Sequence, residues 1–136
     1  MKLGAGFILV CPSTGRVLLG LRNESEPTWA NFGGGVEQYE SPLQCAKREI
    51  AEEAGFIEGQ HYSLVSKRPI DISHYIKFVY RCYLGIVPHE IDPVLNYEHT
   101  QAQWFTLDEI PENTHFGLKR VLSNTKVIKK INKQFI

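Results

Sequence analysis

Residues 41–55 constrain the fold of this chain more than any other segment, because they carry a complete set of helix signals. Ser41 is a typical N-cap, Pro42 suits the first helical position, and Gln44 stands where it closes a capping box. Gly55 is placed to end the helix. The sequence therefore predicts a helix over residues 42–54.

The predicted helix has two different faces at 100° per residue. One buried stripe, within about 80°, consists of Leu43, Ala46, Ile50 and Ala54. A neighbouring arc of about 100° carries Glu49, Glu52 and Glu53. Such carboxylates repel one another, and the helix dipole disfavours acids near its C-terminal end. Either this face is solvated and acidic, or it binds a divalent cation such as Mg²⁺, which prefers oxygen ligands.

The overall charge conceals an uneven distribution. The 136 residues carry fifteen basic and fifteen acidic side chains, which argues against a general binder of nucleic acids or membrane surfaces. Residues 113–136 nevertheless hold six bases and no acid, so the rest of the chain has a net charge of −6. Half of that excess lies in residues 34–56, which contain five acids and two bases.

Length and cysteine content favour one globular domain over residues 1–136, in a reducing compartment. The chain is 43% hydrophobic, enough for a real core. Its three cysteines form no C-x-x-C pair, which argues against a disulfide scaffold or a zinc site. No cleavage site follows the apolar start, and no apolar run is long enough to span a bilayer. We therefore expect a soluble, cytoplasmic protein with no membrane partner.

The remaining elements predict a layered α/β domain with a mixed sheet. β-rich apolar runs at residues 5–11 and 16–22 flank a turn and favour a hairpin. A glycine-punctuated segment precedes the helix. Further along the chain we expect strands at 62–66, 72–87 and 103–107, a helical turn at 108–111 and an amphipathic helix at 116–131.

Residues 34–56 also contain a specific motif. They read G-x5-E-x7-R-E-U-x-E-E-x-G-U, where U is apolar, and every fixed position is filled. This segment resembles the Nudix box. The resemblance implies a Nudix-type α/β/α sandwich, with a mixed β-sheet between helices, and Mg²⁺-dependent cleavage of a diphosphate, with Mn²⁺ as a substitute cofactor. Tyr39 departs from the pattern, because a glycine often precedes the glutamate at position 40.

The resemblance also implies roles for individual residues. Glu49, Glu52 and Glu53 look like metal-binding glutamates, and Arg48 like the residue that positions them. Glu40 resembles the loop acid that reaches the metal site through water or holds the loop. Either backbone carbonyl of the pair Gly33 and Gly34 is a candidate metal ligand, and we select Gly34.

The sequence leaves more than one candidate for the catalytic base, the carboxylate that accepts a proton from the attacking water. Glu52 and Glu53 are candidates within the box. Many relatives use a glutamate from a later loop, and Glu98, just ahead of the strand at 103–107, occupies such a place. Glu90, in the same loop, is the less favoured candidate for this role. The alternative interpretation of Glu98 is an ordinary surface acid.

Several other side chains have open roles. Arg22 could touch a phosphate or simply end a strand, and Trp29 and Phe32 could stack on a base or pack in the core. We assign Tyr75 to the core. Three histidines without metal-ligand spacing are assigned to the surface: His74, His89 and His115.

The leading function is therefore an enzyme that cleaves a nucleoside diphosphate linked to another moiety. Substrates of the family include nucleoside triphosphates, ADP-ribose, dinucleoside polyphosphates and nucleotide sugars, and no further motif selects one. The alternative is a catalytically silent nucleotide-sensing module on the same fold. RNA binding by the basic C-terminal helix is a weaker hypothesis, since such helices usually dock on a sheet. A homodimer is possible, because dimers are common in the family.

Overall fold

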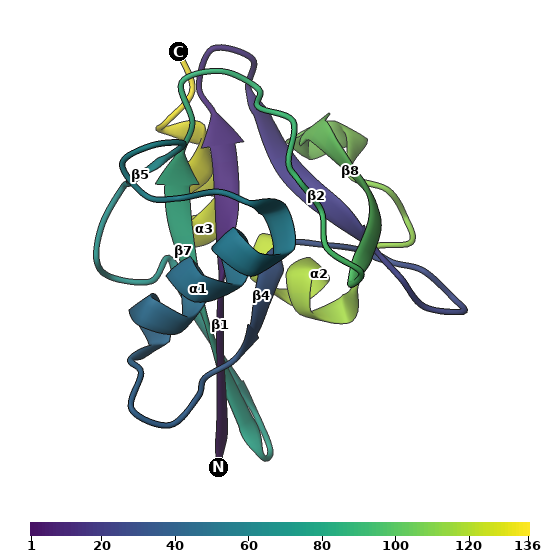
Figure 1. The fold of residues 1–136 in the computed structure, drawn as a ribbon. Coiled ribbons are helices and arrows are strands. Elements are labelled where there is room, and N and C mark those ends of the chain that lie inside the picture. Colours follow the sequence, from purple (N-terminus) through teal and green to yellow (C-terminus); the bar gives the residue numbers. More distant parts are fainter.

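The centre of the molecule is a mixed β-sheet with helices on both faces, as Figure 1 shows for the computed structural model, which describes residues 1–136. The strands are β1 (Lys2–Cys11), β2 (Arg16–Arg22), β3 (Trp29–Ala30), β4 (Phe32–Gly35), β5 (Ser63–Leu64), β6 (Asp71–Tyr75), β7 (Phe78–Ile86) and β8 (His99–Thr106). The helices are α1 (Pro42–Ala54), α2 (Phe116–Leu122) and α3 (Thr125–Asn132), with a short 3₁₀ turn at Leu107–Glu109.

Strand β1 organises the sheet because it pairs with three other strands. It runs parallel to β7 along most of its length. Its first half pairs antiparallel with β4, and its last residues pair antiparallel with β2. The sheet therefore divides at β1, and the β4 branch lies directly beneath α1, which packs on both β1 and β4.

Alternation along β1 supplies both layers of the core. Phe7 and Leu9 pack on the α1 side, together with Ile50 of that helix. Ile8 and Val10 face the other side, where α2 and α3 cover the sheet. The α/β/α sandwich expected from the sequence is confirmed.

The capping signals around residues 41–55 are also confirmed. Ser41 Oγ accepts the Gln44 N–H at 3.1 Å, and Gln44 Oε1 accepts the Ser41 N–H at 2.8 Å. Gly55 closes the helix at φ 75°, in the left-handed region that glycine tolerates. This rigid start and end hold the acidic face of α1 over β4.

Several of the expected elements are wrong in extent. The strand expected at 62–66 covers only Ser63–Leu64, and the strand expected at 103–107 begins earlier, at His99. The strand expected at 72–87 is a hairpin of β6 and β7, which turns at Ile76, a side chain 94% exposed. The helix expected at 116–131 is two helices. Ser123 Oγ donates to the Arg120 carbonyl, and Asn124 Oδ1 accepts the Lys126 N–H, so the polar pair ends α2 and caps α3. A periodic apolar pattern continues through such a break and does not reveal it.

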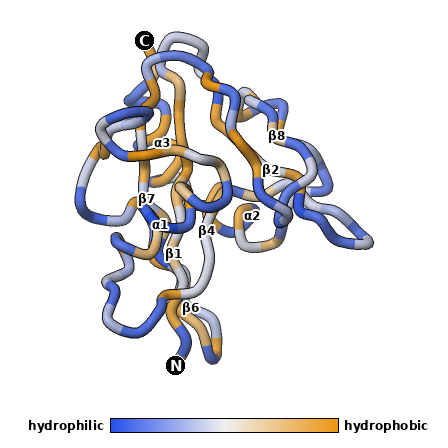
Figure 2. The backbone as a smooth tube through the Cα atoms, in the orientation of Figure 1, coloured by the Kyte–Doolittle hydropathy of each residue, from blue (hydrophilic) through white to orange (hydrophobic).

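Hydropathy follows the layers, with apolar residues along the central strands and polar residues in most connecting loops (Figure 2). None of the helices is both long and apolar enough to cross a membrane.

Candidate active site

Three carboxylates converge where α1, β4 and the start of β8 meet. Glu49 and Glu53 come from α1, and Glu98 immediately precedes β8. One oxygen of each lies within 4.8 Å of the other two, and Glu49 and Glu53 are only 8% and 2% exposed. This acidic cluster is therefore mostly buried, unlike an ordinary acidic surface.

The glycine run of β4 brings backbone against the acidic cluster. The Gly33 N–H donates to Glu53 Oε1 at 2.8 Å. A Cβ on Gly34 would lie 2.5 Å from Glu49 Cδ, so a larger residue would displace that carboxylate. Close approach of the strand to the acids requires glycine there.

Burial sets the electrostatics of the acidic cluster. Desolvation, together with the hydrogen bond to Glu98 and the nearby negative charges, raises the pKa of Glu53 to about 9. Desolvation also raises the pKa of Glu49. No lysine or arginine forms an ion pair with Glu53 or Glu98. With no such partner, Glu53 is held in its protonated form near neutral pH.

Arg48 forms ion pairs with a second set of acids, Glu40 and Glu52, on the outer side of α1. Its guanidinium donates to Glu40 at 2.8 and 3.1 Å, and to Glu49 at 2.9 Å. The hydrogen bond from Arg48 holds the pKa of Glu40 at about 2. Arg48 also contacts Glu52 at 3.2 Å and the Gly35 carbonyl at 3.1 Å, and so ties the loop to the helix.

The predicted site residues fall into two groups. Glu49, Glu53 and Glu98 come together, and Gly34 lies against them. Glu52 lies outside the acidic cluster, with its side chain 52% exposed. Glu90, the substitute for Glu98, forms an ion pair with Arg16 and does not line the cavity at the acidic cluster.

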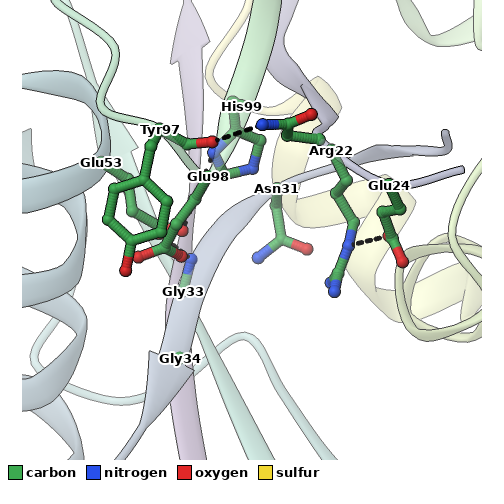
Figure 3. Close-up of a pocket in the computed structure, with 10 residues that line it drawn as sticks. Arg22, Glu24, Asn31, Gly33, Gly34, Glu53, Tyr97, Glu98 and His99 are labelled. Atoms are coloured by element: carbon green, nitrogen blue, oxygen red, sulfur yellow. Dashed lines mark hydrogen bonds and ion pairs between the residues drawn. The ribbon is translucent and has the colours of Figure 1, made fainter.

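A cavity of about 490 Å³ opens beside the acidic cluster and is lined mostly by polar and charged residues. Glu53 and Glu98 line one side of it, as Figure 3 shows. Arg22, paired with Glu24, lies on the other side, with Asn31 between the two groups. The cavity therefore combines acids that could hold a cation with a base that could contact a phosphate.

His99 also lines this cavity, although no motif in the sequence marks it. It is buried, its Nδ1 has no hydrogen-bond partner, and that atom lies 3.8 Å from Glu53 Oε2. Desolvation lowers the pKa of His99, which favours the uncharged ring. Its position directly after Glu98 is the only sequence signal that could have identified it.

The structure also decides several open assignments. Trp29 and Phe32 are buried in the core. The assignment of Tyr75 to the core is wrong, because its ring is half-buried at the edge of a second cleft, where His115 also lies. Tyr39 adopts φ 68°, the conformation that a glycine would take most easily, so this departure from the motif retains the loop shape.

A mixed sheet between helices, with acids of one helix against a glycine strand, is the arrangement expected of a Nudix domain. The chain matches the NUDIX domain over residues 1–125 and belongs to that family. It is 32% identical over 106 residues to an oxidized purine nucleoside triphosphate hydrolase of Danio rerio, covering 71% of this chain and 62% of the relative's length.

Solved structures support the same fold. A binary complex of a C. elegans Ap4A hydrolase has a TM-score of 0.77 at 19% identity, over 93% of this chain and 94% of that one. An E. coli dihydroneopterin triphosphate pyrophosphohydrolase has a TM-score of 0.76 at 19% identity, over 96% and 95%. At such identities the likeness establishes the architecture alone.

Proposed function

We propose that this chain is one catalytic domain that hydrolyses a phosphoanhydride bond in a nucleoside diphosphate linked to another moiety, with Mg²⁺ as its cofactor. The carrying observation is the buried acidic cluster of Glu49, Glu53 and Glu98, for which the chain supplies too little positive charge. Ionising these carboxylates together in a buried site is costly, and a bound divalent cation would supply the positive charge that offsets this cost.

The donor set fits a hard divalent cation. Mg²⁺ takes carboxylate oxygens and usually keeps several waters and substrate phosphates as further ligands. We assign its ligands to Glu49 and Glu53, with Glu52 at the exposed edge and the Gly34 carbonyl on the β4 side. When bound, such an ion lowers the pKa of a coordinated water and offsets phosphate charge. Mn²⁺, with similar ligand preferences, is the expected substitute.

The remaining chemistry is assigned to the chain's own side chains. Glu98 is the preferred proton acceptor for the attacking water, because it borders the cavity and is less buried than Glu53. Glu53 and Glu52 are the alternatives. Arg48 is a positioning residue, since it orients Glu49 and Glu52 through hydrogen bonds. Arg22 lies where it can contact the substrate phosphates.

The substrate class follows from the shape of the site and from the relatives. A polar cavity next to a metal site suits a polyphosphate. Similarity to the Danio rerio enzyme makes nucleoside triphosphates, including those with oxidised purines, the first substrates to test. Dinucleoside polyphosphates, ADP-ribose and nucleotide sugars complete the panel.

The test is turnover of that panel with Mg²⁺, with Mn²⁺ and with chelator, and identification of the products. We expect cleavage only with metal, releasing a nucleoside monophosphate from at least one substrate. Glu112→Gln, a change at an exposed loop acid, is the matched control and should turn over normally. Metal binding and nucleotide binding without any cleavage would instead support the silent sensing module.

A further inference from the structure

We infer that His99 is a positioning residue, which donates a hydrogen bond from its Nδ1–H to Glu53 Oε2 and thereby fixes that carboxylate as a metal ligand. This inference rests on the proposed function, because the role assigned to Glu53 requires its carboxylate to keep one orientation. Both side chains border the cavity at the acidic cluster (Figure 3), and Nδ1 lies 3.8 Å from Oε2. A hydrogen bond needs about 2.7–3.2 Å, so forming it takes a shift of about 1 Å in either side chain.

A bulge in β8 turns His99 towards α1. Gly20 of β2 lies opposite Ala102 of β8. Two residues further along β2, Arg22 would face Thr100 in a regular ladder, but it lies opposite His99. Residues opposite each other share a face, and Ala102 packs on the α1 side of the sheet. The extra residue in β8 therefore places His99 on the α1 side, whereas a regular strand would turn it away.

Close packing holds the His99 ring in this position. The residue is 8% exposed. Its ring centre lies 4.8 Å from that of Phe32, in an edge contact at 60°. A Cβ on Gly20 would lie 2.6 Å from His99 Cδ2, so the lack of a side chain at residue 20 makes room for the ring. The ring has little freedom to turn, and the direction of its Nδ1 is therefore fixed.

The His99 Nδ1 atom is buried and has no hydrogen-bond partner within the chain. Leaving a buried polar atom unpaired is costly, and most such atoms in proteins have a partner. The Glu53 carboxylate can supply one, since its Oε1 accepts the Gly33 N–H at 2.8 Å and its Oε2 is the oxygen near His99. With both hydrogen bonds formed, the carboxylate is held from two strands, β4 and β8.

Glu53 needs such a donor because its other neighbours are acids. Glu49 and Glu98 each have an oxygen within 4.8 Å of a Glu53 oxygen, and like charges at this distance repel an ionised carboxylate. Desolvation favours the uncharged His99 ring, which has one N–H, and we place that proton on Nδ1. Loss of a hydrogen-bond partner of a metal ligand typically lowers metal affinity or activity by about 10–100-fold.

The test keeps or removes a polar group at the position of Nδ1. His99→Phe retains a ring against Phe32 without a donor. His99→Asn brings its amide close to the position of Nδ1, whereas His99→Gln carries its amide to the position of Nε2. Calorimetry with Mg²⁺ alone and steady-state kinetics are applied to each variant, and the cooperative thermal transition confirms that each is folded.

We expect His99→Phe and His99→Gln to lose about tenfold or more in Mg²⁺ affinity and in kcat, with little change in KM for the nucleotide. His99→Asn should stay within about threefold of the unchanged chain in both quantities. His89→Phe makes the same chemical change at an exposed histidine outside the cavity, and should bind Mg²⁺ and turn over normally.

A double-mutant cycle in metal-free solution tests the contact without reference to activity. Glu53→Met keeps the length of the side chain but removes the acceptor. Measured by urea denaturation, the effect of His99→Phe on the unfolding equilibrium constant should differ by about fivefold between the unchanged chain and Glu53→Met. Equal effects in the two backgrounds would overturn the hydrogen bond.

The outcomes separate this inference from the proposed function. Normal Mg²⁺ affinity and kcat in His99→Phe, or equal losses in His99→Asn and His99→Phe, overturn the positioning role and leave the hydrolase in place. A coupling in the metal-free cycle without turnover of any nucleotide by the unchanged chain supports the hydrogen bond and rejects the hydrolase.

Discussion

Two acidic groups flank helix α1, and they differ in whether an arginine balances their charge. On the outer side, Arg48 donates two hydrogen bonds to Glu40, and the pKa of Glu40 is held at about 2. On the inner side, Glu53 lies against Glu98 with no lysine or arginine partner, and its pKa is raised to about 9. Compensated acids stabilise the loop before α1. Uncompensated acids create a place for a ligand that the chain does not contain.

The largest effect should follow from removing the most buried acid. Glu53→Gln keeps the shape and the hydrogen bond from Gly33 but removes a charge and a metal ligand. We expect turnover to fall by about 10³-fold, because loss of a ligand impairs both metal binding and water activation. Steady-state kinetics across a Mg²⁺ titration measures this. A variant with normal kcat at saturating Mg²⁺ would remove Glu53 from the chemistry.

Glu98 is the next residue to test, because it separates catalysis from metal binding. Glu98→Gln should slow turnover at least about tenfold and leave the fold intact, since a general base contributes roughly 10²–10⁴-fold. Glu90→Gln is the matched control from the same loop, because it pairs with Arg16 outside the cavity. Equal kcat values in the two variants would exclude Glu98 as the base.

The ion pair between Arg48 and Glu40 should affect the stability of the fold rather than turnover. Arg48→Ala leaves Glu40 and Glu49 without their partner, and hydrogen bonds to charged groups contribute about 1.5–3 kcal/mol each. We expect a loss of about 2 kcal/mol in the free energy of unfolding in metal-free solution, measured by urea denaturation. Lys47→Ala, which removes an exposed ion pair with Glu58, should cost less than about 1 kcal/mol. Equal losses would show that Arg48 has no special role.

The sequence predicted the elements that local signals specify. The caps of α1 and the spacing of its glutamates are local properties, so the helix and its acidic face followed directly. The apolar run at residues 5–11 likewise predicted a strand, which is the greater part of β1. The break between α2 and α3 was missed because Ser123 and Asn124 act through hydrogen bonds, which apolar periodicity does not record.

The site was only partly predictable, for a different reason. Glu98 lies 45 residues after Glu53, and their contact depends on how the loop before β8 crosses the sheet. The burial of His99 and the opening of the second cleft depend on the same tertiary arrangement. Tyr75 was assigned to the core because a hairpin was interpreted as one long strand, which hid the turn that places the ring at an edge.

The last prediction compares the effects of the two acidic groups on stability as the pH changes in metal-free solution. The folded pKa of Glu53, about 9, exceeds the ordinary value of 4.5, so the native state binds more protons between these values. Stability should therefore fall as pH rises from about 5 to 9. Glu40 has the opposite sign: its contribution is present above pH 4.5 and is lost as pH falls towards 2.

Thermal denaturation from pH 3 to 9 measures both slopes. Glu53→Gln should flatten the alkaline slope and leave the acidic one, whereas Glu40→Gln should do the reverse. Mg²⁺ should raise the melting temperature most at alkaline pH, where Glu53 is ionised and can bind it, because a ligand that binds only the native state stabilises it. A Mg²⁺ effect that is independent of pH, or that survives in Glu53→Gln, would locate the cation away from the uncompensated acids.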